Sequence, residues 1–181
     1  GSNHKVKFGA NYIYHTFTPS SFSGSSGDQE FGTEEITRIK ANEGAIYILD
    51  EFEIGERIKI NAGARLSAFQ HIGPFTRYYK NETSQLTDST RTWGKGESII
   101  VYPGFEPRFS ARYLFADQSS FKLGFTHNYQ YVHLASISAI SLPTDLWFPS
   151  SELVKPQIGT QYSIGYFKNF KENTFETSVE L

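Results

Sequence analysis

The sequence predicts an all-β protein: an antiparallel up-and-down meander of about seven strands, forming part of a transmembrane β-barrel wall with long extracellular loops. Three observations predict this fold. Apolar and polar residues alternate along most segments, which places them on opposite faces of strands. Apolar residues at the spacing of an amphipathic helix are nearly absent. The links between alternating segments are short and long in turn, which is typical of outer-membrane barrels.

Period-two alternation begins near the N-terminus and recurs to the C-terminus. The clearest example is 57–69, where Ile58, Ile60 and Ala62 face one way. Lys59 and Asn61 face the other way. The stretch 36–54 has apolar residues on both faces, so its inward face stays open. The predicted strands are residues 5–16, 36–54, 57–69, 105–115, 121–131, 157–166 and 174–181.

The links between these strands fall into two length classes. Residues 54–57, 117–120 and 168–173 make short turns, whereas 19–37, 73–104 and 135–155 are long. Outer-membrane barrels have short periplasmic turns and longer extracellular loops. The strands also reach the roughly 9 to 11 residues that a tilted membrane strand needs. We therefore expect a membrane barrel rather than a soluble sheet.

The two faces of the predicted sheet differ in composition. Tyr and Phe at the strand ends of the apolar face resemble the aromatic girdle of a membrane barrel. The girdle candidates are Tyr12, Tyr14, Tyr113, Phe115, Tyr129 and Tyr131. The opposite face is rich in Gly, Asn, Gln, Lys and Arg, which suits a polar lumen. Its candidate lumen-facing residues are Lys59, Arg65, Arg108, Arg112 and Lys122.

Composition excludes several classes of protein. Eleven Tyr and 16 Phe in 181 residues favour strands. No apolar run approaches the roughly 20 residues that a membrane helix needs. A net charge of −2 without a basic stripe argues against a nucleic-acid-binding protein. The absence of Cys excludes a disulfide framework, a thiolate nucleophile and a Cys-based zinc site.

The ends of the chain indicate an excised piece of a larger protein. The sequence contains no Met, and Gly1-Ser2 resembles the remnant of a cleaved tag. The last segment, 174–181, ends as a strand without a turn signal. We expect residues 1–3 to be a tag remnant and residues 4–181 to be a fragment of a barrel domain.

No group of residues supports catalysis or metal binding. Asp50, Glu51 and Glu53 could suggest glycosidase chemistry, but they split between strand faces beside a tight turn, which favours a solvated turn. The histidines lack the spacing and the nearby carboxylate of a metal-ligand set, so solvated or interfacial side chains are expected for His15, His71, His127 and His133. We therefore predict no catalytic residue, no metal, no cofactor and no enzyme activity.

Aromatic residues in two of the long links are the candidate ligand contacts. Exposed aromatic side chains on extracellular loops can stack on a sugar or an aromatic siderophore. They can also pack against neighbouring loops. The candidates are Tyr78, Tyr79, Trp93, Trp147 and Phe148.

Three segments resemble the barrel of a TonB-dependent receptor of the Bacteroidetes type. AIYILDEFEIGERIKINAGARLSA (45–68) is similar to a hairpin of that family, with a short turn before a strand that ends in Gly-x-Arg. FEPRFSARYLFADQSSFKLGFTHNYQ (105–130) resembles the next hairpin. LPTDLWFPSSELVKPQIGTQYSIGYF (142–167) resembles a loop-to-strand passage. The resemblance covers nearly the whole chain after Ser2.

The resemblance implies a bacterial outer-membrane importer with about 22 strands and a plug domain inside the lumen. Its solute would be scarce: an iron chelate, cobalamin or a glycan. The expected partners are outer-membrane lipid, the plug of the same parent chain, the TonB complex and the solute. The lumen-facing residues would contact the plug or the solute. A fragment without the plug is expected not to transport, and to self-associate through its apolar face and open edges.

Two other folds remain open on the residues alone. A soluble β-sandwich, for example a carbohydrate-binding module, would pack the same apolar faces sheet on sheet. It would be a compact monomer without detergent. A small lipocalin-like barrel is a third reading, which the long loops disfavour.

Overall fold

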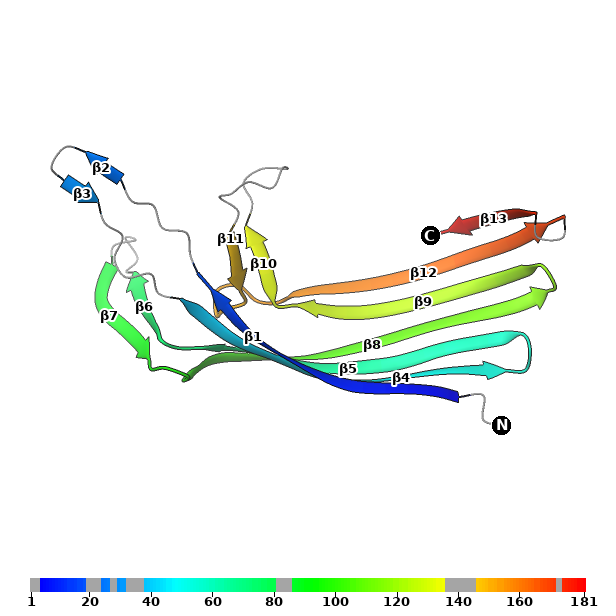
Figure 1. Cartoon of the computed structure of the whole chain (residues 1–181), viewed down its shortest axis with the longest axis horizontal. Coiled ribbons are helices and arrows are strands. Elements are labelled where there is room, and N and C mark those ends of the chain that lie inside the picture. The colour runs from blue at the N-terminus through cyan, green and yellow to red at the C-terminus, as the bar shows by residue number, and fades with distance from the viewer. Residues whose placement is uncertain are drawn as a thin grey trace.

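A sheet of seven strands is the main element of the structure. The computed structural model describes residues 4–18, 24–26, 29–31, 38–80, 86–135, 146–171 and 174–181. The seven strands form one antiparallel sheet in the order β1-β4-β5-β8-β9-β12-β13 (Figure 1), which confirms the predicted meander. Among the described residues, no helix is long and apolar enough to cross a membrane. The strands are β1 (His4–Phe17), β4 (Ile39–Ile54), β5 (Ile58–Ile72), β8 (Ser98–Ala116), β9 (Ser119–Gln130), β12 (Gln157–Phe170) and β13 (Phe175–Glu180).

Small hairpins extend the long links at one end of the sheet, and short turns join the strands at the other end (Figure 1). The second long link is shorter than the predicted 73–104, because β8 begins at Ser98. Pro103 and Gly104 indicated a loop, yet both lie within β8. The hairpins are β2 (Gly24–Ser26) with β3 (Gln29–Phe31), β6 (Phe75–Lys80) with β7 (Leu86–Trp93), and β10 (Val132–Ala135) with β11 (Leu146–Pro149).

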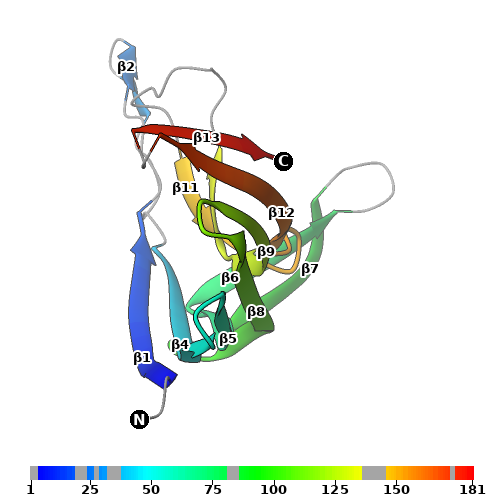
Figure 2. The same ribbon diagram turned by 90° about the vertical axis from the view of Figure 1, so that its right-hand side faces the viewer.

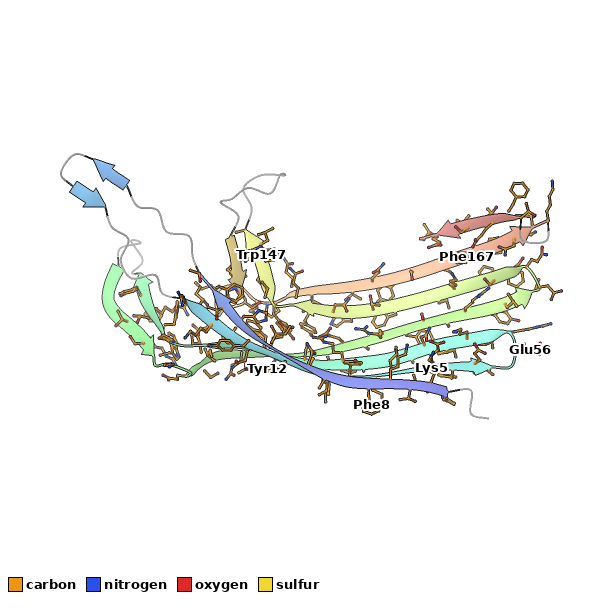
Figure 3. The ribbon with its side chains drawn as sticks, viewed as in Figure 1. Lys5, Phe8, Tyr12, Glu56, Trp147 and Phe167 are labelled. Carbon is orange, nitrogen blue, oxygen red and sulfur yellow. The ribbon has the colours of Figure 1, made fainter. Side chains whose placement is uncertain are left out.

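The register of the sheet gathers polar side chains on one face. Lys59 of β5 pairs with Glu53 of β4 on one side and with Arg112 of β8 on the other. Alternate residues along each strand share that face. The sheet curls into an open trough (Figure 2), and Phe8 projects from its outside (Figure 3). We call the face that carries Phe8 the convex face and the face that carries Lys59 the concave face.

Strand β4 has apolar residues on both faces, and its register assigns them. Ile46 pairs with Leu66, which places it on the convex face. Tyr47 lies on the concave face, where it pairs with Gly9 of β1. The Tyr47 ring covers this glycine, since a Cβ added there would lie 2.6 Å from the Tyr47 hydroxyl oxygen. The second apolar face of β4 therefore packs inside the trough.

The convex face is apolar and uncovered by any described part of the chain. Phe8 is 80% exposed and Tyr162 is 75% exposed. The described residues form no second large sheet on this face and no closed barrel, so the sandwich and lipocalin-like readings have no counterpart in the structure. Further exposed apolar residues of the convex face are Val6, Ile46, Ile48, Leu66, Phe105, Phe109, Leu123, Ile158 and Ile164.

A small hydrophobic core lies at the loop end of the concave face. It consists of Ala41, Phe69 and Tyr131, with Tyr102 and Tyr129 packed against them. The prediction that Tyr131 belongs to an outward-facing girdle is wrong, because Tyr131 is 3% exposed and stacks on Phe69. β9 ends at Gln130, so strand alternation no longer directs the next side chain outward. The exposed girdle candidates are Tyr12, Tyr14, Tyr113 and Phe115.

Candidate functional site

The predicted lumen-facing residues all lie on the concave face. Arg65 pairs with Glu106 across β5 and β8, and Arg108 pairs with Gly63. The remaining cations occupy one row nearer the short turns: Lys59, Arg112 and Lys122. Whether this face lines the lumen of a complete barrel stays a prediction.

A polar network crosses the concave face at the loop end. The Ser67 hydroxyl donates to Glu106 Oε1 at 2.5 Å. Arg65 lies between two carboxylates, 3.5 Å from Glu106 and 3.7 Å from Glu43. Glu43 in turn lies 3.0 Å from His15 Nε2. The Glu106 side chain is only 7% exposed, and removing Arg65 would leave its charge buried without a cationic partner.

Tyr131 closes this network above the sheet. Its hydroxyl lies 2.8 Å from Ser67 Oγ, and because Ser67 already donates to Glu106, Tyr131 is the donor. Burial, together with the nearby carboxylates of Glu106 and Glu43, raises the pKa of Tyr131, so the hydroxyl keeps its proton. The fit requires a glycine beneath it, since a Cβ on Gly104 would lie 2.5 Å from the Tyr131 hydroxyl oxygen.

The link between β9 and β12 folds inward over the concave face. The Tyr102 hydroxyl donates to the Ser151 carbonyl oxygen at 2.8 Å. Arg77 of β6 forms an ion pair with Glu152 of the same link. The same link also contacts β1 through its strand β11. The second and third long links are therefore joined to each other and to the trough.

Two of the histidines that were expected to be solvated or interfacial, His71 and His133, are buried. His133 is 5% exposed, and its Nε2 lies 2.9 Å from Ser150 Oγ. Burial lowers the pKa of His133, which favours the neutral ring. His127 Nδ1 lies 2.8 Å from Thr160 Oγ1. Within the described ranges no group of three or more His, Cys, Asp or Glu side chains could hold a metal ion.

The carboxylates near the first short turn are divided between the two faces. Glu51 and Glu53 lie on the concave face, 2.7 Å and 3.6 Å from Lys59 Nζ. Asp50 lies on the convex face, 2.7 Å from His4 Nδ1. The three carboxylates therefore do not form one cluster, in agreement with the split between strand faces that the sequence predicts.

The loop aromatics differ in how far they reach solvent. Tyr78 is 62% exposed, Tyr79 38% and Trp147 56%. Trp93 is only 2% exposed and packs beneath the Arg91 guanidinium, 4.6 Å from its ring centroid. Phe148 is half-buried against His133, with ring centroids 5.4 Å apart. Figure 3 shows Trp147 on the hairpin that rises from the trough.

The network of Glu43, Ser67 and Glu106 was not singled out by the sequence. Strand alternation could have placed each on the polar face. Their contacts depend on the register between β4, β5 and β8, which pairs Arg65 with both Tyr47 and Glu106. The short turn between β4 and β5 sets the register of that pair, whereas a long link joins β5 to β8, and no short-range signal in the sequence specifies their register.

Comparison with known proteins agrees with the geometry. The family model described as TonB dependent receptor-like, beta-barrel matches residues 1–181. No curated protein and no solved structure matches the chain. The narrower Bacteroidetes type stays a prediction. Because the family model matches the sequence from its first residue to its last, the chain belongs to the TonB-dependent receptor β-barrel family.

Proposed function

We propose that this chain is part of the wall of an outer-membrane importer for a scarce solute, an iron chelate, cobalamin or a glycan. The coarser role, an outer-membrane receptor or transporter, follows from the family. In the proposal the convex face meets lipid and the concave face lines the lumen. The plug domain and the TonB complex would act on it through the rest of the parent protein.

The observation that supports the proposal most is the uncovered convex face. Phe8, Tyr162 and their neighbours leave a continuous apolar surface across the sheet. Exposed apolar patches larger than a few hundred Å² usually mark a membrane or protein contact. Burying such surface is worth about 25 cal/mol per Å². A lipid environment satisfies this face without any further part of the chain.

The loop end supports contact with a solute. Tyr78, Tyr79 and Trp147 expose aromatic rings, which can stack on a sugar or an aromatic chelator. The ion pair of Arg77 with Glu152 connects the hairpin β6–β7 to the link that carries the hairpin β10–β11. Trp93 is too buried to contribute, so we assign the stacking role to the exposed rings.

Single-cysteine labelling of the full-length protein in lipid tests the assignment of the faces. The chain has no Cys, so each introduced thiol reports alone. A water-soluble thiol reagent should spare cysteines at Phe109, Leu123 and Ile164 of the convex face. It should reach cysteines at Asn61, Ser110 and Ser163 of the concave face. Labelling after denaturation confirms that every thiol can react, and equal labelling of both groups in lipid would refute the proposal.

A further inference from the structure

His71 is a buried histidine at the loop end of β5, on the concave face. Counted from Ile58 beside the short turn, it lies beyond the roughly 9 to 11 residues that a tilted strand needs to cross a membrane. His71 is 4% exposed, and neither of its ring nitrogens forms a hydrogen bond within the described part of the chain. A buried imidazole without a partner is destabilised far more as a cation than as a neutral ring.

The groups around His71 offer a protonated ring little compensation. Ala41 of β4 and Ile100 of β8 lie directly opposite it and carry no charge. The charged side chains beside it are Arg77 of β6 and Glu152, and these two already form an ion pair with each other. Burial lowers the pKa of His71, and the Glu152 carboxylate only partly offsets this effect. A hollow of about 70 Å³ beside the ring has the apolar walls Phe75, Ile99 and Leu153.

Side chains, rather than a strand ladder, hold the link between β9 and β12 against the trough at this end. β8 pairs with β9 only from Arg108 toward the short turn, although both strands continue toward the loop end. Segments held by a few side-chain contacts open at a lower free energy than paired strands do. The described polar contacts that cross to the link are Tyr131 with Ser67, Tyr102 with the Ser151 carbonyl, and Arg77 with Glu152.

We propose that His71 makes the contact between this link and the trough a pH-sensitive latch, closed while the ring is neutral and released when the ring takes up a proton. With the link open, water reaches the ring, which then binds a proton near its ordinary pKa of about 6.5. The closed form binds that proton less readily, so a fall in pH below about 6.5 favours the open form. Above that pH neither form is protonated, and the closed form keeps its full stability. The inference goes beyond the proposed function and does not depend on which face meets lipid.

Two other histidines at the loop end respond to acid in ways that differ from His71. His15 Nε2 lies 3.0 Å from Glu43, so protonation strengthens that ion pair and does not release the link. His133 is buried, and its Nε2 lies 2.9 Å from Ser150 Oγ, so a protonated ring keeps this hydrogen bond as the donor. That bond lies within the link and does not join the link to the trough.

Thiol labelling of the full-length protein in detergent tests the latch. Ala41→Cys reports opening, because Ala41 is 0% exposed and packs with Phe69 and with Tyr131 of the link. Thr90→Cys on β7 is exposed and gives the rate for an accessible thiol at the same pH. The ratio of the two rates measures how often the link opens. Between about pH 7.5 and about pH 5.5 this ratio should rise about tenfold, because the open form alone gains a proton near pH 6.5.

Substitutions at His71 identify the group that titrates. His71→Gln and His71→Leu both remove the titrating ring, and each should keep the ratio constant over this range. His127→Gln is the matched control and should keep the rise, because His127 bonds Thr160 across β9 and β12, outside the link. A constant ratio without any substitution at His71, or a rise that persists in either His71 variant, overturns the proposal.

A third reporter separates release of the link from unfolding of the whole protein. Ser120 is 2% exposed at the short-turn end, and Ser120→Cys changes its side chain by one atom. Its labelling ratio should stay constant between the two pH values. If the thiols at Ser120 and Ala41 become accessible together, acid unfolds the sheet as a whole and the latch is overturned.

Discussion

At the scale of single residues, Gly104 is a position where the concave face tolerates little change. A Cβ there would lie 2.5 Å from the Tyr131 hydroxyl oxygen and 2.6 Å from Ser67 Oγ. Gly104→Ala should displace Tyr131, break its hydrogen bond to Ser67 and lower the free energy of unfolding by about 1 to 3 kcal/mol. Denaturant unfolding of the full-length protein measures this change.

Gly159→Ala is the matched control for that substitution. Gly159 has nothing within 4 Å of an added Cβ, so alanine should be tolerated there. If both variants lose the same unfolding free energy, the loss in Gly104→Ala does not come from the displacement of Tyr131.

At the scale of elements, an ion pair connects the hairpin β6–β7 with the segment that follows β11, since Arg77 lies on β6 and Glu152 follows Pro149, the last residue of β11. Arg77 and Glu152 are 24% and 30% exposed, so the pair is partly screened and worth up to about 1 kcal/mol. Arg77→Gln or Glu152→Gln should therefore speed hydrogen exchange in both hairpins without changing the Tm of the whole protein.

A double-mutant cycle isolates the contribution of that pair. If Arg77 and Glu152 act through each other, the double variant should exchange about as fast as either single variant. Additive effects would show that each side chain holds its own hairpin by other contacts. Thr92→Val is the control, because the Thr92 hydroxyl lies 3.2 Å from that of Thr76 within one hairpin and its loss should affect only β6–β7.

The sequence predicted the bounds of some strands closely and those of others poorly. β5 was predicted within three residues at its end, because its apolar and polar residues alternate without interruption. β8 begins seven residues before the predicted start, because Pro103 and Gly104 are residues of loops as well as of irregular strands. Tyr131 was assigned to the wrong face because alternation was extended past the end of β9.

Contacts between strands were beyond the reach of the sequence. The polar face, and with it all the predicted cations, follows from parity within each strand. The approach of Arg65 to Glu106 follows from the register between β5 and β8, which local pattern does not specify across a long link. Arg112 and Lys122 lie on β8 and β9, where the short turn between the strands sets the register. The hydrogen bond between Tyr131 and Ser67 has two requirements. The strands must pair in the observed register, and the link after β9 must fold inward over the sheet.

At the scale of the whole molecule, the convex face and the two sheet edges set the behaviour of the chain in water. The edges of the described sheet are β1 and β13, whose unpaired backbone groups can pair with another chain. Phe8, close to one edge, is 80% exposed, and Val179, at the other, is 62% exposed. An edge and an apolar patch side by side favour association.

We therefore expect the 181-residue chain to self-associate in detergent-free buffer and to become monodisperse in detergent above its micelle concentration. Light scattering coupled to size-exclusion chromatography measures both states. Phe8→Glu with Leu123→Glu should reduce association in buffer and weaken detergent binding, because both residues lie exposed on the convex face. The same charges at Asn61 and Ser110 of the concave face should do neither. A compact monomer in plain buffer would instead mean that the convex face finds a partner within the chain, and the lipid-facing assignment would have to be abandoned.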